Sequence, residues 1–315
     1  MNIYYPFSLK NEIPKHFIKV KRNKKNKDLK KVKENRYYEE ISLLNNIIEL
    51  DKSHKLRQEK CNENCRYNLT LPYKDNKVTL NSSPNFINAS WIHMPHPYYF
   101  IATQGPLPHT IEDFWIMCYE NKIPVIVMLC NLIEDNKEKC ADYWNIKDLK
   151  KFEITIIKEE KEEEIYIRTF QIFNKELKDS MTITQIHFTS WEDHNSLSEQ
   201  YFNTLIKIIN KLDDLKKEKK GVIHCSAGVG RTGTFICFYN LYHEIMKQIN
   251  VEKNSKEIIF CIFNLVRKIK EMRMYSVENV IQYSLLYQFS NYLLLNYNVK
   301  KKKKKSLKKF FDLST

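Results

Sequence analysis

A glycine-rich segment, residues 221–233, constrains the fold of this chain more than any other part of its sequence. The chain has 315 residues and only five glycines, and four of these glycines lie in the segment. A short apolar run, Val222-Ile223, precedes the glycine-rich turn, and residues 232–249 follow it with the spacing of a helix. Glycine has no Cβ and permits positive φ, so the backbone can curl closely around a small ligand. The segment therefore predicts a strand, a tight loop and a helix whose N-terminal amide groups point at an anion.

Two side chains in this segment carry chemistry. Cys225 begins the turn and Arg231 ends it six residues later, and these residues are called the 225–231 loop below. A guanidinium binds two oxygens of a phosphate with a matching fork of N–H groups. A helix N-terminus and a nearby cation favour the thiolate form of a cysteine, which is the nucleophilic form. The loop therefore predicts a cysteine that attacks phosphorus and forms a covalent intermediate.

Two other interpretations of the same turn are a buried cysteine that binds no ligand and a dinucleotide-binding loop. The dinucleotide reading is disfavoured because Gly228-Val229-Gly230 follows a cysteine and continues into Arg231-Thr232. The placement of the glycines favours the phosphate loop over both.

The formal net charge of +14 is concentrated at the two ends of the chain. Residues 1–33 hold eleven Lys or Arg against two acids, and residues 300–315 hold eight Lys against one acid. The rest of the chain is therefore nearly neutral, with a balance of about −2. Nothing in it resembles a nucleic-acid-binding module, so we expect no nucleic-acid partner. The lysine run of residues 300–305 is interpreted as a solvated tail, with an anionic membrane surface or a nuclear signal as the alternatives.

The eight cysteines and the absence of targeting signals point to a cellular compartment. Several cysteines lie inside apolar runs, as buried thiols do, and their spacing does not suggest a disulfide framework. Cys61 and Cys65 form a CxxxC pair, but no second pair completes a tetrahedral zinc site. No apolar run approaches about 20 residues, and the N-terminus has neither a signal-peptide core nor a glycine at position 2. We expect a soluble cytoplasmic protein, with nuclear or membrane-peripheral locations as alternatives.

The periodicity of the body predicts a single mixed α/β domain. Helices are expected at residues 110–122, 196–215, 232–249, 255–272 and 277–295, and strands at 125–130, 152–157, 165–173, 182–188 and 222–223. The charged residues 158–164 are expected to form the turn of a hairpin. We divide the chain into a basic N-terminal arm or helix (1–33), a catalytic domain (34–297) and a polybasic C-terminal tail (298–315).

The segment His224-Cys-Ser-Ala-Gly-Val-Gly-Arg-Thr-Gly233 resembles the signature loop of the tyrosine-specific protein phosphatases. The resemblance runs from about Asn35 to Tyr292. It implies a highly twisted mixed sheet flanked by helices, with the phosphate-binding loop between a strand and a helix. It also implies hydrolysis of phosphotyrosine in proteins through a phosphocysteine intermediate, with no metal or cofactor. Phosphotyrosyl proteins are then the expected partners, and we expect a monomer.

The resemblance assigns roles to the residues that match the family's motifs. Cys225 is the nucleophile, Arg231 binds the phosphate oxygens, and Asp193 in Trp191-Glu192-Asp193 is the general acid that protonates the leaving tyrosine. The family has proline where this chain has Glu192, and because the loss of proline frees φ, we expect a looser loop around Asp193. The backbone of the loop between nucleophile and arginine is expected to bind phosphate, through Ser226, Ala227, Gly228, Val229 and Gly230.

Further positions match the family less specifically. Tyr37, in Asn35-Arg36-Tyr37, is expected to stack on phosphotyrosine, with a core aromatic as the alternative, and Glu39 is expected to contact the substrate backbone. Glu134 and Lys139 resemble residues that brace the site, although a solvated role is equally compatible with the sequence.

Four more residues have expected supporting roles around the 225–231 loop. His224 is expected to fix the loop, with a purely structural histidine as the alternative, and Thr232 is expected to help the cysteine leave. Gln282-Tyr283 matches the later pair of a family segment, which places Glu278 where the family has the glutamine that orients the hydrolytic water. An ionised carboxylate opposes a phosphoryl group, so we expect slower hydrolysis of the intermediate unless Gln282 substitutes.

These departures leave two rival functions open. One is a phosphotyrosine-binding pseudophosphatase whose turnover has been weakened by Glu192 and Glu278. The other is a phosphatase of dual or lipid specificity that uses the basic tail as a membrane anchor.

Overall fold

The computed structural model describes residues 16–21, 34–50, 58–81, 86–94, 99–191, 197–215, 220–250 and 257–311. For residues 34, 47–50 and 298–311 it describes the backbone alone.

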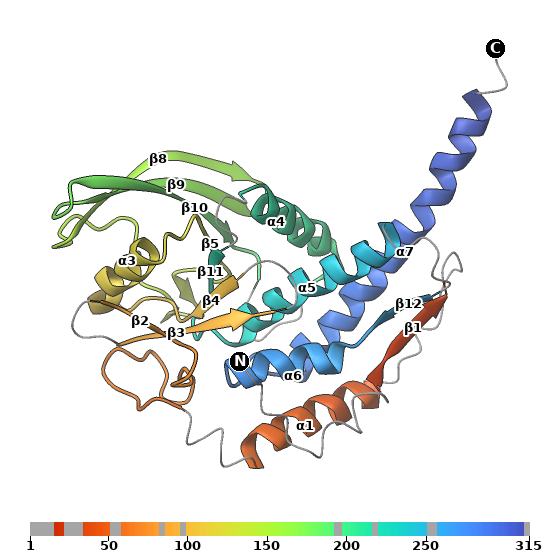
Figure 1. Cartoon of the computed structure of the whole chain (residues 1–315), viewed down its shortest axis with the longest axis horizontal. Helices are drawn as coiled ribbons and strands as arrows, with labels where there is room; N and C mark the ends of the chain where they lie inside the picture. Colours follow the sequence, from red (N-terminus) through yellow and green to blue (C-terminus); the bar gives the residue numbers. More distant parts are fainter. Residues whose placement is uncertain are drawn as a thin grey trace.

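An eight-stranded twisted sheet forms the centre of the molecule (Figure 1). Its strand order is β2-β3-β4-β11-β5-β10-β9-β8. The four central strands are parallel, and antiparallel strands flank them on both sides. The strands are β2 (Lys77–Thr79), β3 (Phe86–His93), β4 (Tyr99–Thr103), β5 (Val125–Met128), β8 (Phe152–Glu162), β9 (Ile165–Asn174), β10 (Asp179–Phe188) and β11 (Lys220–His224). The predicted twisted mixed sheet is therefore confirmed.

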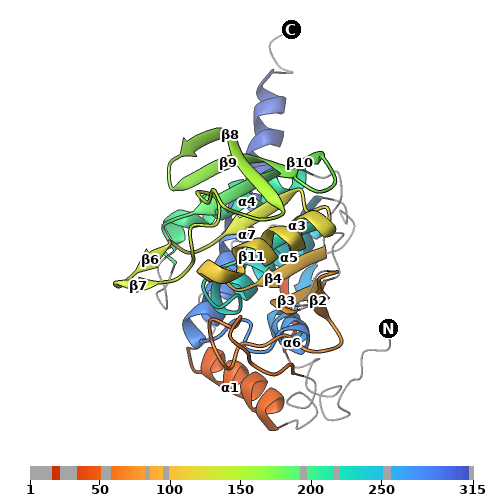
Figure 2. The same ribbon diagram turned by 90° about the vertical axis from the view of Figure 1, so that its left-hand side faces the viewer.

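Helices cover both faces of this sheet, which explains why its central strands are apolar throughout. All four residues of β5 are buried, as is expected for parallel strands that pack helices on both sides. One face carries α3, and α4 to α7 lie on the other (Figures 1 and 2). The helices are α1 (Glu34–Leu50), α3 (Ile111–Glu120), α4 (Phe202–Asp214), α5 (Gly230–Asn250), α6 (Ile262–Met272) and α7 (Val280–Phe311).

Two small antiparallel pairs lie outside the central sheet. One pair joins β6 (Ile133–Glu134) to β7 (Lys137–Glu138). The other joins β1 (Ile18–Lys21) to β12 (Glu257–Phe260). Ile18 and Val20 are buried, so β1 is part of the folded domain. The interpretation of residues 1–33 as an arm or surface helix is therefore wrong for β1, and the rest of that segment lies outside the described residues.

Two more expectations fail because long-range pairing decides the local structure. The start of the predicted 255–272 helix is strand β12, which pairs with β1, a segment 236 to 242 positions before it in the chain. The charged residues 158–162 continue β8 instead of forming a turn, since β8 is the edge strand and its side chains there face solvent.

A buried carboxylate attaches α1 to α7. Glu40 is only 2% exposed and accepts hydrogen bonds from the hydroxyl of Tyr283 (2.6 Å), the hydroxyl of Tyr287 and Nε of Arg36 (2.9 Å). Burial alone would raise the pKa of Glu40, but these hydrogen bonds lower it below its usual value. The ionised Glu40 therefore fixes α1 against the core.

Helix α7 continues beyond the packed body and projects away from it as far as Phe311 (Figure 1). Across the described residues, none of the helices combines the length and the apolar character that a membrane crossing requires.

Candidate active site

The strand-loop-helix unit predicted around the glycines is formed by β11, the 225–231 loop and α5. Gly228 has φ +70°, and a Cβ at this position would lie 2.2 Å from the carbonyl oxygen of Thr103. Only glycine tolerates both the left-handed backbone and this close approach to β4. The bend of the loop therefore depends on Gly228.

The carbonyl groups of the loop are bound from outside. The carbonyl oxygen of Cys225 lies 3.2 Å from Nδ1 of His224, and that of Ser226 accepts from the amide of Gly105 (2.9 Å). The carbonyls of Ala227 and Gly228 both accept hydrogen bonds from the guanidinium of Arg273. Because N–H and C=O of a trans peptide point in opposite directions, the amides of the next residues face the inside of the loop. There the amide of Gly228 donates to Sγ of Cys225 at 3.3 Å. The inner side of the loop is therefore lined with donors, as an anion requires.

The guanidinium that holds these carbonyls belongs to Arg273, a residue that the sequence analysis did not single out. It donates from Nε to the oxygen of Gly228 (2.7 Å) and from Nη2 to that of Ala227 (3.3 Å). The oxygens of Ser90 and Asn88 on β3 hold its other side, at 3.0 and 2.9 Å. Burial lowers the pKa of Arg273 to about 10, opposed by the electrostatic attraction of Cys225. Arg273 is therefore charged near neutral pH and connects the loop to the sheet.

Arg231, at the end of the loop, is 2% exposed and forms a two-bond ion pair with Glu134. Its Nη1 and Nη2 donate to the two carboxylate oxygens at 2.7 and 2.9 Å, and Nη1 also donates to the carbonyl of Trp191 at 2.9 Å. Burial opposes the charge, but the hydrogen bonds to Glu134 and the attraction of Cys225 raise the pKa of Arg231 above its usual value. Glu134 therefore holds the guanidinium of Arg231 through both carboxylate oxygens.

Segment 104–108 packs behind the loop. A Cβ on Gly105 would lie 2.8 Å from the carbonyl of Lys139 and 2.9 Å from that of Cys225, so this position has no room for a side chain. Lys139 itself is buried, and its amide donates to the carbonyl of Leu132 at 2.8 Å. The backbone of Lys139 therefore lies beside the loop, next to Gly105.

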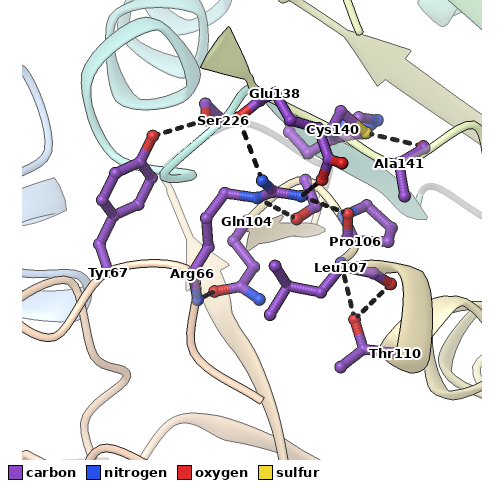
Figure 3. A network of polar contacts seen from close by, with 12 residues as sticks. Arg66, Tyr67, Gln104, Pro106, Leu107, Thr110, Glu138, Cys140, Ala141 and Ser226 are labelled. Carbon is purple, nitrogen blue, oxygen red and sulfur yellow. Dashed lines mark hydrogen bonds and ion pairs between the residues drawn. The ribbon is translucent and has the colours of Figure 1, made fainter. Parts of the chain in front are cut away.

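Tyr67 contacts the loop directly. Its hydroxyl lies 2.9 Å from Oγ of Ser226 (Figure 3). The preceding residue, Arg66, donates to the carbonyls of Gly105 (3.1 Å) and Pro106 (2.6 Å) and pairs with Glu138. Arg66 therefore fixes the segment that carries Tyr67. The Tyr67 side chain is 38% exposed, at the rim of the loop.

The model of the protein-tyrosine phosphatase family matches residues 61–292. This chain belongs to the protein-tyrosine phosphatase family.

Curated phosphatases and solved structures agree with the family assignment. The rat tyrosine-protein phosphatase non-receptor type 20 is 34% identical over 239 residues, which cover 73% of this chain and 54% of that protein. The mouse receptor-type tyrosine-protein phosphatase eta is 34% identical over 71% of this chain and 18% of that protein. The chain thus aligns with about half of the type 20 phosphatase and a smaller part of the receptor.

Among solved structures, the catalytic domain of human protein tyrosine phosphatase non-receptor type 18 has a TM-score of 0.69 and 26% identity. The alignment covers 82% of this chain and 95% of that domain. A structure of the type 18 phosphatase in complex with HER2 phosphopeptides has a TM-score of 0.72 at 26% identity, over 83% of this chain and 93% of that one.

The structure corrects the expectation for Tyr37. This residue lies on α1, is partly buried against the core, and contacts the ring of Tyr287 at a tilt of 46°, with ring centroids 4.8 Å apart. It therefore has the alternative role, that of a core aromatic, and it lies outside the matched phosphatase segment. Glu39, on the same helix, is exposed. The Arg-Tyr pair occurs twice in the sequence, and the second copy, Arg66-Tyr67, is the one beside the loop.

The expected water-orienting region lies next to the loop. A Cβ on Gly230 would be 2.8 Å from Nε2 of Gln282 and 3.0 Å from Oε2 of Glu278. The amide of Glu278 donates to Oε1 of Gln282 at 2.8 Å. Val277, directly before Glu278, has φ +56°, which is strained for a β-branched residue. Strain of this kind is concentrated at functional sites.

Three further predicted residues are placed as follows. Thr232 is fully buried, and its hydroxyl has no hydrogen-bond partner within the described ranges. His224 is also fully buried, and burial lowers its pKa to about 3. Asp193 and the neighbouring Glu192 lie outside the described residues, although Trp191 immediately before them is buried. Among the described residues, no three His, Cys, Asp or Glu side chains gather as a metal ion would need.

Proposed function

We propose that this protein hydrolyses phosphotyrosine in proteins through a phosphocysteine intermediate. One observation carries the proposal. The sulfur of Cys225 accepts the amide hydrogen of Gly228 inside a loop whose first four carbonyls, those of residues 225–228, are held from outside, and Arg231 closes the same loop. A phosphate dianion would find amide donors, a guanidinium and a nucleophile in one place.

In the first step the thiolate of Cys225 attacks phosphorus, and the bond between phosphorus and the tyrosine oxygen breaks. Asp193 gives its proton to the departing oxygen, because tyrosinate, whose conjugate acid has a pKa of about 10, is a poor leaving group without one. The loop amides and Arg231 stabilise the charge on the three equatorial oxygens.

In the second step water attacks the phosphocysteine, and the thiolate of Cys225 leaves. Thr232 has a buried hydroxyl with no partner in the described part of the chain, so it can donate a hydrogen bond to the departing sulfur. Gln282 lies against Gly230 and is proposed to orient the water, with Glu278 beside it.

Tyr67 is proposed as the residue that limits substrates by length. The aromatic ring of a phosphotyrosine places its phosphate farther from the peptide backbone than the single Cβ of a phosphoserine does, and Tyr67 stands at the rim of the loop beside Ser226. The aromatic face can stack on the substrate ring. The complexes of the type 18 phosphatase with HER2 phosphopeptides support phosphotyrosyl proteins as the substrate class. We further propose a cytoplasmic location, on the pattern of buried free thiols.

Hydrolysis of matched phosphotyrosyl and phosphoseryl peptides tests this function. We expect the wild type to prefer the phosphotyrosyl peptide, and Tyr67→Ala to raise its KM by about tenfold, the loss of about 1.4 kcal/mol of stacking and packing. The control is Tyr37→Ala, which should lower the unfolding temperature and leave KM unchanged. Equal rates on both peptides would instead indicate a phosphatase of dual specificity, and binding without turnover a pseudophosphatase.

Replacing Glu278 with glutamine is expected to speed the second step. Removing a negative charge near the phosphoryl group relieves about 1 kcal/mol of repulsion at an exposed site, equivalent to about a fivefold rise in kcat. Stopped-flow hydrolysis of an aryl phosphate should show a burst for the wild type and a smaller one for the variant. Glu278→Ala separates removal of the charge from introduction of the amide. Unchanged turnover in Glu278→Gln would contradict the expectation.

A further inference from the structure

A continuous series of buried polar contacts runs from the outer strands of the sheet to Cys225. Nη1 of Arg168 on β9 donates to Oε1 of Gln185 on β10 at 2.9 Å. Nε2 of Gln185 donates to the hydroxyl of Tyr143 at 2.6 Å, and this hydroxyl lies 2.9 Å from Nε2 of His224. Nδ1 of His224 lies 3.2 Å from the carbonyl oxygen of Cys225. All of these side chains are buried.

The direction of every hydrogen bond in the series follows from its first member. A guanidinium can only donate, so the group of Gln185 that faces Arg168 must be its oxygen. The amide nitrogen of Gln185 then faces Tyr143 and donates to its oxygen. The hydroxyl hydrogen of Tyr143 is left for His224, since the other acceptor that the described residues offer is the weak thioether sulfur of Met128 at 3.9 Å.

This direction selects one form of His224. Burial lowers its pKa to about 3, so the ring is neutral near neutral pH and carries one proton on either nitrogen. Because Nε2 accepts from Tyr143, the proton is on Nδ1 and is donated to the carbonyl of Cys225. The opposite tautomer would place the lone pair of Nδ1 against that carbonyl oxygen.

The carbonyl of Cys225 belongs to the same peptide group as the amide of Ser226. Holding the carbonyl on the His224 side turns the Ser226 amide towards the inside of the loop, because the two groups point in opposite directions. We propose that Arg168 and Gln185 are positioning residues, which set the tautomer of His224 and so aim the Ser226 amide at the phosphate. The catalytic part of this proposal rests on the proposed function of the 225–231 loop.

The anchor of the series is itself fixed in place. The guanidinium of Arg168 lies over the rings of Trp144 (4.8 Å) and Tyr166 (4.9 Å) and pairs with Glu159. Its Nη1 also contacts Nδ1 of His187 at 3.4 Å. Burial lowers the pKa of His187 to about 4, so this histidine is neutral and accepts from Arg168. The donor end of the series is therefore fixed in place.

Two substitutions of Gln185 test the proposal. In Gln185→Glu the carboxylate accepts from both Arg168 and Tyr143, which reverses the series and moves the His224 proton to Nε2. Gln185→Met is the matched control, since it removes both hydrogen bonds but leaves Tyr143 free to donate to His224. We expect kcat/KM to fall by about 30- to 100-fold in Gln185→Glu, the effect of a misaimed group, and by less than about fivefold in Gln185→Met.

The tautomer is read directly by ¹H–¹⁵N correlation of the histidine rings, which needs no activity. We expect Nδ1–H for His224 in the wild type and Nε2–H in Gln185→Glu. In a Tyr143→Phe background, Gln185→Glu should change kcat/KM by less than about threefold, because the hydroxyl that connects residue 185 to His224 is then absent. If the wild type has no phosphatase activity, the proposed function is refuted. The tautomer of His224 in the wild type and in Gln185→Glu would then still test whether residue 185 sets it.

Any of three results overturns the inference. They are an Nε2–H tautomer in the wild type, a Gln185→Met variant as impaired as Gln185→Glu, and additive effects of Gln185→Glu and Tyr143→Phe. If Gln185→Glu does not fold, the wild-type tautomer and the Gln185→Met and Tyr143→Phe kinetics still test it.

Discussion

Replacing Cys225 with serine is expected to lower kcat for an aryl phosphate by about 10⁴-fold or more. Removal of a catalytic nucleophile has losses of this size in other hydrolases, because the remaining groups bind but do not form the covalent intermediate. Serine is nearly isosteric with cysteine, so the amide of Gly228 and the ion pair of Arg231 should stay in place. Hydrolysis measured from pH 5 to 8 checks the loss.

The control is Cys237→Ser. Cys237 lies on α5 and is fully buried, and burial raises the pKa of its thiol well above the usual value. Its replacement should lower the free energy of unfolding and leave kcat within about twofold, because this thiol faces the core. Cys225→Ser should still bind a phosphotyrosyl peptide, as fluorescence polarisation can measure. If Cys225→Ser kept more than about 1% of the wild-type kcat, the nucleophile would have to be another group.

The sequence predicts those parts of the site whose residues lie close together in the chain. The 225–231 loop was recognisable because strand, glycines, cysteine and arginine follow one another within a dozen residues. The helix at 110–122 and the strand at 125–130 were likewise found, as α3 and β5. The periodicity of apolar residues is enough to define such elements.

The rest of the site depends on contacts between residues far apart in the chain. Arg273 holds carbonyls 45 and 46 positions before it, and no pattern near Arg273 announces this role. Gln185 lies 42 positions from Tyr143, so their contact appears only when β10 is placed in the sheet. The expectation that Tyr37 stacks on phosphotyrosine fails for the same reason. The two Arg-Tyr pairs are alike locally, and only the contact of Tyr67 with Ser226 distinguishes them.

Replacing Arg231 with lysine is expected to lower kcat by about 10²- to 10³-fold although the charge is kept. An ammonium group is a point donor and cannot bind two phosphate oxygens with the fork of a guanidinium. Loss of one well-aimed donor in a comparable oxyanion site costs about 10²- to 10³-fold in kcat. The expected loss is therefore one of geometry, and it should appear in kcat more than in KM, since the fork matches the transition state.

The same substitution also separates catalysis from folding, because Arg231 and Glu134 are a buried pair with 2% and 8% of their side chains exposed. Removing one charge of such a pair costs about 3–5 kcal/mol of stability, and Arg231→Lys, which keeps the charge but loses the two-bond geometry, should lose part of this. The kcat must therefore be referred to the folded fraction from urea unfolding. Glu134→Gln is the matched variant. It keeps one acceptor for Arg231 and leaves the phosphate fork intact, so we expect at least as large a loss of stability with a fall in kcat of only about tenfold. Equal kcat losses in Arg231→Lys and Glu134→Gln would mean that Arg231 acts by holding Glu134 and Trp191 in place, and a direct role on phosphate would then be excluded.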